Sequence, residues 1–277
     1  MNYVDGQPAD SLPLDDRGLN YGDGLFETVA LRDGEPQHWS LHYARLAEGA
    51  ARLGIVCPAS GILLQDLSAA LPRPVPDRLV AKIMLTRGSG GRGYAPPMPS
   101  HTRRIVRLSA WPEWPQSHAG EGVALSLCAT PLARNPVLAG IKHLNRLEQV
   151  LASQELAGSG AVEGLMFDDS SRVIEGTRTN VFLVAGRELL TPRLDQCGIA
   201  GVMRALVIDL ARALALHVTE TRVERSLLFS ANELFVCNSL IGIWPVREIL
   251  SPIGRSFSSM PVTRRLMQEL KARDLAP

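Results

Sequence analysis

The sequence predicts an α+β fold organised in two domains. Strand-like and helix-like segments follow one another without the strict strand–helix alternation of a parallel sheet. The chain has 277 residues, of which 45% are hydrophobic, enough for a substantial core. The stretch Trp111–His118 is rich in proline and polar residues. We therefore expect a smaller domain at 1–110, a linker at 111–120 and a larger domain at 121–277.

The first domain is expected to combine strands with two helices. Ser40 is a suitable N-cap for a helix over Leu41–Leu53, whose apolar residues recur at helical spacing and which Gly54 ends. A second helix is expected over 62–71, where Pro72 stops it. Turns are expected at 15–18 and 21–24, and strands at 25–31, 78–87 and 103–110.

The second domain is expected to contain both helices and strands, in no regular alternation. Amphipathic or apolar patterns there predict helices over 144–157, 202–216 and 263–272. Short apolar runs bounded by turn residues predict strands over 122–130, 163–167, 173–185 and 233–236.

Composition and charge exclude several classes of function. The 29 basic and 28 acidic residues give a net charge of +1, so no general attraction to nucleic acid or membranes is expected. The N-terminus lacks the pattern of a secretory signal, and no apolar run approaches the length of a membrane span. The four cysteines (Cys57, Cys128, Cys197 and Cys237) are far apart and fit neither a zinc site nor a disulfide framework. We expect buried thiols in the reducing cytoplasm, and no metal.

Lys142 is the first candidate for a chemical role. Small and apolar residues precede it and an amphipathic segment follows it, so its amine is expected to be partly desolvated. Desolvation disfavours the ammonium form, and a neutral amine can attack a carbonyl, as a Schiff-base lysine must. The alternative is a surface lysine that buries its methylene groups and keeps its charge in water.

A glycine-rich loop is the second candidate. Gly88–Gly93 fits the G-x-G-x-x-G pattern after a strand, but the prolines that follow exclude the helix that a dinucleotide site requires. The loop is either only flexible or a mobile segment that presents Arg92 and Tyr94 to an anionic substrate. The arginine fork suits a carboxylate.

Two further segments suggest a cofactor. Gly198–Arg204 leads into an amphipathic helix, whose N-terminal N–H groups can bind a phosphate or can simply be an ordinary helix start. Glu175 lies on an otherwise apolar strand, where a buried carboxylate needs a cationic partner. That partner is either an arginine or the protonated ring nitrogen of a pyridinium cofactor.

Taken together, these segments resemble the fold-type IV pyridoxal-phosphate enzymes. This family comprises branched-chain aminotransferases, D-amino-acid aminotransferases and aminodeoxychorismate lyases. The resemblance runs from Asp5 to Pro245, with Tyr21–Thr28 and the Glu175 segment general to the family. Two segments, Arg87–Tyr94 and Ala139–Val150, resemble the lyases in particular.

The resemblance implies a fold, a cofactor and an assembly. The fold is an N-terminal α/β sandwich followed by a C-terminal pseudo-barrel with flanking helices, the latter carrying Lys142. The cofactor is pyridoxal 5'-phosphate, the ligand is a small-molecule substrate, and the assembly is a homodimer.

The resemblance also implies roles for individual residues. Lys142 matches the lysine that holds the cofactor covalently, Glu175 the acid that keeps its ring nitrogen protonated, and Arg45 the phosphate-binding arginine. The implied phosphate cradle consists of the N–H groups at Ile199, Ala200, Gly201 and Val202 and those around Asn238, Ser239 and Leu240. The implied substrate-binding residues are Arg92, Tyr94, Phe26, Arg178 and Asn180.

The chain departs from the family pattern at two positions. Arg178 is unusually bulky, and it either faces solvent or contacts an anionic substrate. Leu19 offers no hydroxyl where some lyases carry a threonine, so no hydroxyl proton transfer is expected there.

The activity implied by the resemblance is the conversion of 4-amino-4-deoxychorismate to 4-aminobenzoate and pyruvate for folate biosynthesis. A D-amino-acid or branched-chain aminotransferase would share Lys142, Glu175 and Arg45 and differ in its substrate pocket. A non-catalytic carrier of pyridoxal phosphate is a third hypothesis, and the Arg92 loop argues against it, because a carrier needs no grip on a substrate carboxylate.

Overall fold

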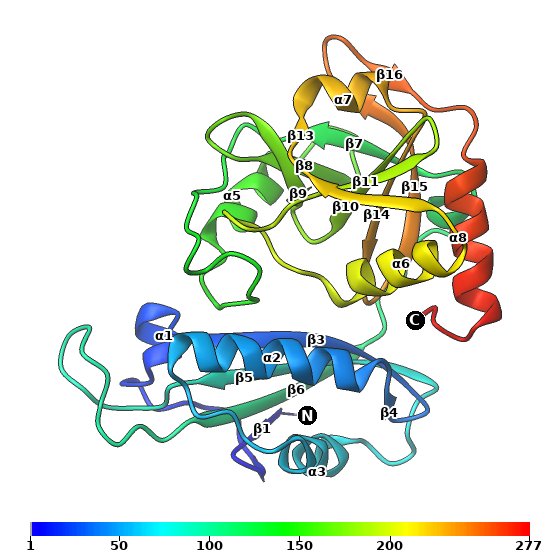
Figure 1. Cartoon of the computed structure of the whole chain (residues 1–277). Coiled ribbons are helices and arrows are strands. Elements are labelled where there is room, and N and C mark those ends of the chain that lie inside the picture. The colour runs from blue at the N-terminus through cyan, green and yellow to red at the C-terminus, as the bar shows by residue number, and fades with distance from the viewer. Residues whose placement is uncertain (1) are drawn as a thin grey trace. The chain divides into compact units, whose positions relative to one another are not determined.

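The computed structural model describes residues 2–277, which divide into two compact units (Figure 1). The first comprises residues 2–112 and the short segment Ile141–Asn145, and the second comprises Glu113–Gly140 and Arg146–Pro277. Lys142, which was expected in the larger domain at 121–277, therefore belongs to the first unit.

The first unit contains a six-stranded antiparallel sheet in the order β2-β1-β6-β5-β3-β4. Its strands are β1 (Asn2–Val4), β2 (Gln7–Pro8), β3 (Gly24–Arg32), β4 (Glu35–Pro36), β5 (Arg78–Thr86) and β6 (Arg103–Ala110). The central strands β3 and β5 pair along their whole length, from Gly24 opposite Thr86 to Arg32 opposite Arg78. They are the predicted strands of this region, and their apolar residues form much of the unit's core.

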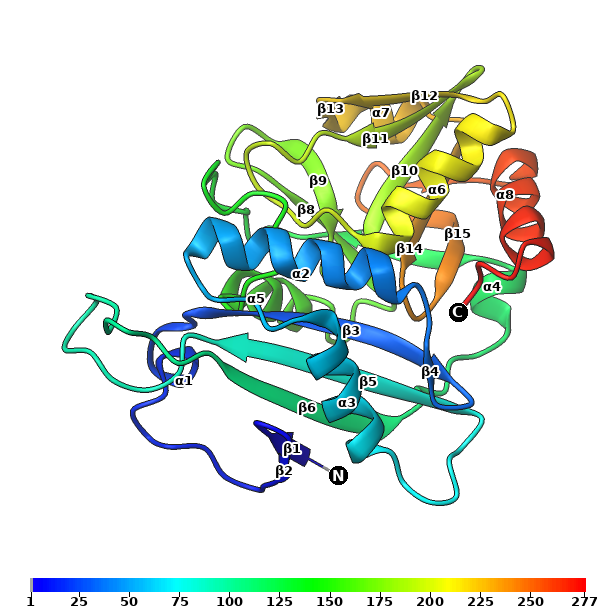
Figure 2. The same cartoon turned by 60° about the horizontal axis from the view of Figure 1, so that its bottom comes forward.

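Three helices accompany this sheet, namely α1 (Arg17–Tyr21), α2 (Trp39–Leu53) and α3 (Ser60–Ala70). Helix α2 packs on β3, and α3 packs on β6 and β1 (Figure 2). Helix α2 ends at Gly54 as predicted but begins before Ser40, because the His38 carbonyl already accepts the N–H groups of Leu41 and His42.

Helix α1 replaces the turn predicted at 15–18. The Asp16 carboxylate accepts the N–H groups of Gly18 (2.8 Å) and Leu19 (3.3 Å), which is the arrangement of a helix N-cap. Gly22, with a φ of 64°, ends the helix after a single turn.

The second unit contains a ten-stranded mixed sheet in the order β12-β11-β10-β14-β15-β7-β8-β9-β13, with β16 paired to β15. Its strands are β7 (Val123–Leu127), β8 (Glu163–Phe167), β9 (Arg172–Gly176), β10 (Asn180–Ala185), β11 (Glu188–Pro192), β12 (His217–Thr221), β13 (Val223–Glu224), β14 (Glu233–Asn238), β15 (Gly242–Leu250) and β16 (Arg255–Ser256). Strands β9 and β13 also lie beside β10 and β11, so the sheet curls into the predicted pseudo-barrel.

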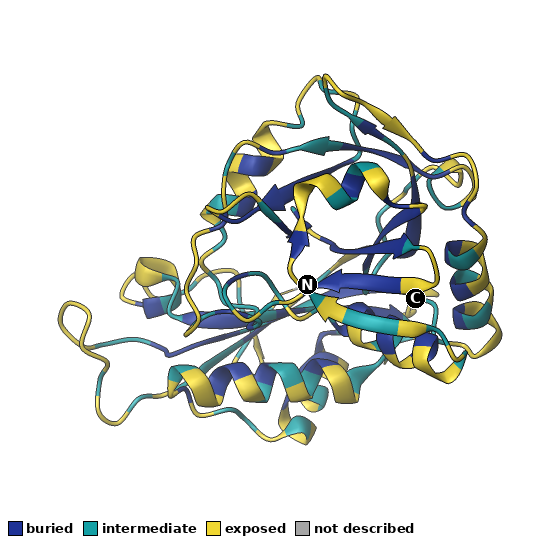
Figure 3. Ribbon diagram, turned by 45° about the horizontal axis from the view of Figure 1, so that its top comes forward, coloured by how far each residue is buried: buried dark blue, intermediate teal, exposed yellow. Residues whose placement is uncertain are grey.

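The helices of the second unit are α4 (Ser117–Gly120), α5 (Leu147–Gln154), α6 (Val202–Ala213), α7 (Arg225–Ser230) and α8 (Pro261–Ala272). Helices α6 and α8 pack on β14 and on each other, over a core in which the rings of Phe182 and Phe235 stack at 4.9 Å. A second core centred on the sheet includes Trp244. Figure 3 shows that buried residues concentrate on the strands.

Helix α5 is shorter than the helix predicted over 144–157. The Leu144 N–H donates to the Gly24 carbonyl (3.0 Å) and the Asn145 side chain donates to the Gly22 carbonyl (3.0 Å). These residues therefore pair with the first unit and are unavailable to start a helix. Among residues 2–277, no helix combines the length and apolar character that crossing a membrane requires.

Candidate active site

Lys142 lies beside the first residues of β3. Its carbonyl accepts the Phe26 N–H (2.9 Å), and His143 forms an isolated bridge with Leu25. The Lys142 side chain is half-buried, and its Nζ lies 4.3 Å from the centroid of the Phe26 ring. The aromatic ring thus covers one side of the amine, and the backbone pairing fixes where the side chain starts.

Arg45, on helix α2, is held in place by the buried carboxylate of Glu27, which lies on strand β3. The Arg45 Nε donates to Glu27 Oε1 at 2.8 Å, and an Nη of the same guanidinium donates to Glu27 Oε2 at 2.5 Å. His42, one turn earlier on α2, places its Nδ1 2.6 Å from Glu27 Oε2. Only 1% of the Glu27 and His42 side chains is exposed, against 11% for Arg45. The guanidinium is therefore oriented by two hydrogen bonds.

Burial and mutual contacts set the charges of Glu27, His42 and Arg45. Burial by itself would raise the pKa of Glu27, but the Arg45 charge and the hydrogen bonds from His42 and Arg45 lower it to about 2. Burial lowers the pKa of His42, although Glu27 acts in the opposite direction. At neutral pH the histidine is thus uncharged and donates its Nδ1–H to an ionised Glu27. Neither Glu27 nor His42 was among the candidates predicted from the sequence.

Glu175 lies on β9 in the second unit and is 3% exposed. Its Oε2 accepts the Ile199 N–H at 2.8 Å, and its Oε1 accepts the Gln149 side-chain amide at 3.3 Å. Arg146 is close enough to be attracted to Glu175. Burial lowers the pKa of the Arg146 guanidinium, and the charge of Glu175 partly opposes that effect. The sequence left open whether the partner is an arginine or a cofactor ring, and a cationic side chain is indeed nearby. Gln149 and Arg146 were not predicted.

The turn that leads into α6 uses two of the four predicted cradle amides for its own bonds. The Ile199 N–H donates to Glu175, and the Ala200 N–H donates to the Gly140 carbonyl at 2.9 Å. Within residues 2–277, the N–H groups of Gly201 and Val202 donate to no acceptor, as expected at the start of a helix. Of the four amides predicted to bind a phosphate here, those of Gly201 and Val202 are therefore the two that remain available.

Asn180 fixes this turn from β10. Its side-chain amide donates to the Ile199 carbonyl at 2.8 Å, and it is 6% exposed. A Cβ on Gly201 would lie 2.0 Å from Asn180 Oδ1, so only glycine fits here without displacing the asparagine. Asn180, which was predicted to bind substrate, thus bonds to the backbone of this turn.

Replacing Gly201 by alanine is expected to weaken both the fold and cofactor binding. The displaced Asn180 would lose its bond to Ile199, and overpacking of this kind costs about 1–3 kcal/mol. Urea unfolding and titration with pyridoxal phosphate measure the two effects. Gly61→Ala is the control, because a Cβ at Gly61 meets nothing within 4 Å. Equal cofactor affinity in the two variants would contradict the cradle.

The second predicted part of the cradle is the turn between β14 and β15. Asn238 Oδ1 accepts the N–H groups of Leu240 (2.9 Å) and Ile241 (3.0 Å), and the Asn238 side-chain amide donates to the Arg178 carbonyl at 3.2 Å. The Leu240 amide is therefore used within the turn, and the Ser239 amide is the candidate that this turn offers.

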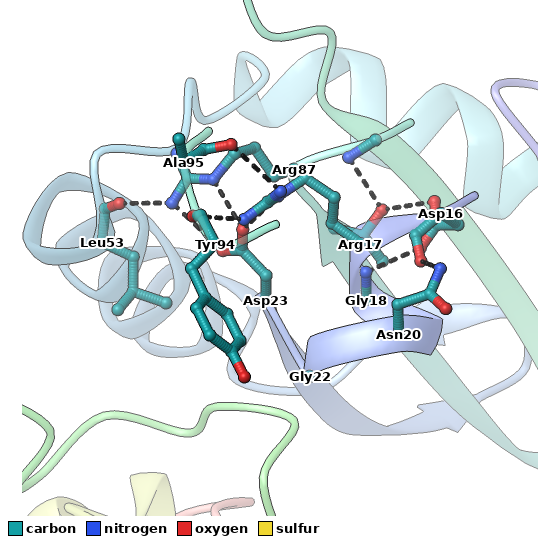
Figure 4. Close-up of polar contacts among 12 residues, drawn as sticks. Asp16, Arg17, Gly18, Asn20, Gly22, Asp23, Leu53, Arg87, Tyr94 and Ala95 are labelled. Carbon is teal, nitrogen blue, oxygen red and sulfur yellow. Dashed lines mark hydrogen bonds and ion pairs between the residues drawn. The ribbon is translucent and has the colours of Figure 1, made fainter. Parts of the chain in front are cut away.

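The predicted substrate residues differ in their surroundings. The Arg178 guanidinium donates to the Val162 carbonyl at 2.9 Å and lies 3.7 Å from Glu163, so it binds groups of the protein itself. Arg92 and Tyr94 are exposed, Tyr94 at 87%, on the glycine-rich loop. The backbone of that loop is held by Arg17, which was also not predicted (Figure 4).

The residue types fit pyridoxal phosphate. The first unit contains an amine, that of Lys142, and an oriented guanidinium, that of Arg45. The second unit contains a buried carboxylate, that of Glu175, and the N–H groups at the start of α6. A guanidinium and a helix start suit a phosphate, and the carboxylate suits a protonated ring nitrogen. Residues 2–277 contain no group of histidine, cysteine and acidic residues that could hold a metal, and the four cysteines are free thiols.

Comparison with known proteins identifies the family. The family model for amino-transferase class IV matches residues 24–249. The 4-amino-4-deoxychorismate lyase of Pseudomonas aeruginosa, a solved structure, is 45% identical, with a TM-score of 0.92 and 98% of each chain covered. The aminodeoxychorismate lyase of Vibrio harveyi is 34% identical over 279 residues, which cover 98% of this chain and 99% of that protein.

An aminotransferase is a more distant relative. The D-alanine aminotransferase of Bacillus licheniformis is 25% identical over 269 residues, which cover 94% of this chain and 91% of that protein. Both the predicted α+β fold and the predicted family are thereby confirmed. The chain belongs to the amino-transferase class IV family, the fold-type IV group of pyridoxal-phosphate enzymes.

Proposed function

We propose that this protein is an aminodeoxychorismate lyase, which converts 4-amino-4-deoxychorismate to 4-aminobenzoate and pyruvate in folate biosynthesis. The observation that carries the proposal is the near full-length similarity to lyases from two organisms. Within that similarity, the Arg87–Tyr94 and Ala139–Val150 segments are the ones that resemble the lyases in particular.

The proposed cofactor is pyridoxal 5'-phosphate, on which class IV enzymes depend. Lys142 would hold it covalently, and Glu175 would face its ring nitrogen. Arg45 and the N–H groups of Gly201, Val202 and Ser239 would bind its phosphate. When bound, the cofactor supplies an electron sink for charge that develops beside the substrate amine.

The protein's own groups would carry the proton transfer. The Lys142 amine, once released, would take the proton from the ring carbon that bears the substrate amine, as a general base. The bond between the neighbouring carbon and the enolpyruvyl oxygen would then break and the ring would become aromatic. The departing enolpyruvate would take up a proton to become pyruvate, which balances the proton taken by Lys142. The Phe26 ring would keep water from one side of the lysine amine.

Arg92 and Tyr94 would bind a substrate carboxylate. If Arg92 holds it equally in the ground and transition states, Arg92→Ala should raise KM by about 10- to 100-fold and leave kcat nearly unchanged. Steady-state kinetics with aminodeoxychorismate measure this. Arg187→Ala, another exposed arginine, is the control. An unchanged KM would remove Arg92 from the site.

An aminotransferase on the same scaffold is the alternative, favoured by the more distant relatives. A D-amino-acid enzyme would be expected to carry a histidine near the Tyr94 position. The two activities separate in one assay, because a lyase releases pyruvate from aminodeoxychorismate without an acceptor, whereas amino transfer requires a keto acid. Turnover that depends on an added keto acid would overturn the lyase proposal.

The cellular setting is part of the proposal. We place the enzyme in the cytoplasm as a homodimer, as the family resemblance implies. The free cysteines agree with a reducing compartment, and burial raises the pKa of Cys128, Cys197 and Cys237 to about 12, which makes these thiols unreactive.

A further inference from the structure

One buried side chain on α1 holds the tip of the glycine-rich loop. The Arg17 side chain is 4% exposed. Its guanidinium donates to three successive carbonyls of the loop, those of Gly93 (3.1 Å), Tyr94 (2.9 Å) and Ala95 (3.3 Å) (Figure 4). In the part of the chain that the structure describes, these are the only hydrogen bonds made by residues 91–99.

The orientation of Arg17 is fixed from its other side. Its Nε donates to Asp23 Oδ2 at 2.9 Å, and Arg87 donates to both oxygens of Asp23, at 2.8 and 3.1 Å. Arg87 in turn donates to the carbonyls of Leu53 and Gly54 at the end of α2. Burial acts to raise the pKa of Asp23, but Arg87 and Arg17 hold it below its usual value, so the carboxylate stays charged.

A second contact joins the same helix to the loop. The Arg17 guanidinium lies 4.9 Å from the centroid of the Tyr21 ring, and that ring packs edge-on against Tyr94 at 5.5 Å. The backbone and the ring of Tyr94 are therefore both positioned by α1.

The loop itself is poorly suited to keep one conformation. Gly90, Gly91 and Gly93 have φ values of 103°, 78° and 62°, and glycine gives the unfolded loop the most conformations. Arg92 and Tyr94 gain no order from burial, because both are exposed. Because the side chains of Arg92 and Tyr94 are not buried, the loop depends on other contacts to keep one conformation. The three hydrogen bonds from the planar Arg17 guanidinium provide them.

We propose that Arg17 is a positioning residue that holds the 90–99 segment in one conformation and so sets where Arg92 and Tyr94 meet the substrate carboxylate. The second part of this inference rests on the proposed function, whereas the first does not. Arg17 would act through the loop and would not touch the substrate.

Limited trypsin digestion tests the first part without substrate, because Arg92 is the exposed cleavage site within the loop. In Arg17→Lys, the charge beside Asp23 is kept but the planar fork is lost. Cleavage after Arg92, followed by mass spectrometry, should become faster by about tenfold or more, since each lost hydrogen bond to a charged group favours opening by at least that factor. Arg17→Ala should have a larger effect.

Arg104→Lys is the matched control, because Arg104 bonds Asp66 at 2.6 Å in the same unit and does not contact the loop. Its cleavage after Arg92 should equal that of the wild type. The proposal would be overturned if trypsin cleaved Arg17→Lys after Arg92 at the wild-type rate. It would also be overturned if Arg104→Lys were cleaved there as fast as Arg17→Lys.

Kinetics with aminodeoxychorismate test the second part. Arg17→Lys should raise KM by about tenfold with a smaller change in kcat, whereas general loosening of the fold would lower the active fraction and hence kcat. An unchanged KM together with faster cleavage would overturn the link to the substrate. If the wild type made no 4-aminobenzoate, the proposed function would fail, and the digestion would still decide whether Arg17 holds the loop.

Discussion

Replacing Lys142 by alanine is expected to abolish turnover, with a loss of about 10⁴-fold or more, because one amine serves as both the cofactor's anchor and the general base. The visible absorbance of the bound cofactor should disappear together with the activity. Absorbance spectra and 4-aminobenzoate release from the same preparations measure both. Retained turnover in Lys142→Ala would contradict the assignment.

The chain offers a stringent control for this experiment. It contains only three lysines, and Lys82 on β5 also lies near the Phe26 ring, at 5.0 Å. Burial lowers the pKa of Lys82, so its amine has some of the properties expected of Lys142. Borohydride reduction of the loaded enzyme followed by peptide mapping should place the cofactor mass on the Lys142 peptide, and Lys82→Ala should remain active. Cofactor mass on the Lys82 peptide would show that Lys82, and not Lys142, holds the cofactor.

Replacing Glu27 by alanine is expected to destabilise the first unit by about 3–5 kcal/mol, the usual cost of leaving one partner of a buried ion pair alone. The variant should also bind pyridoxal phosphate less tightly, because Arg45 would lose both bonds that orient it. Urea unfolding and cofactor titration measure these effects. Glu48→Ala, at an exposed position on α2 whose nearest arginine contact is 4.0 Å, should change stability by less than about 0.5 kcal/mol. Equal stability of the two variants would contradict the role of Glu27.

The same group gives stability a pH dependence with a defined sign. The pKa of Glu27 falls from its usual 4.5 to about 2 on folding, so its contribution, about 3 kcal/mol, is complete above pH 4.5 and is lost as the pH falls toward 2. The pKa of His42 is also lowered, so its contribution begins to be lost as the pH falls below its usual 6.5. The Tm should therefore decrease below pH 6.5 and more steeply below 4.5, and Glu27→Ala should flatten the steeper part.

Local patterns predicted the elements whose neighbours in sequence are also their neighbours in space. The strand at Arg103–Ala110 and the end of α2 at Gly54 agree with the prediction, because alternation and a C-terminal glycine are local signals. The start of α5 does not, because Leu144 and Asn145 bond to the distant residues Gly24 and Gly22. Local pattern carries no information about such a partner.

The same distinction separates the candidate residues. Lys142 and Glu175 could be selected because each is unusual in its own segment. Arg17 could not, since it bonds carbonyls 76 to 78 residues away and carbonyls leave no trace in side-chain patterns. Glu27 had a usable signal that was passed over, a carboxylate on a buried strand followed by a helix with His42 and Arg45 three residues apart.

Lyase activity is tested by measuring both of its products together. Purified protein loaded with pyridoxal phosphate and given aminodeoxychorismate without any keto acid should release 4-aminobenzoate and pyruvate in equal amounts, and Lys142→Ala should release neither. Absence of 4-aminobenzoate from the wild type, or its formation only after a keto acid is added, would show that the protein is not a lyase.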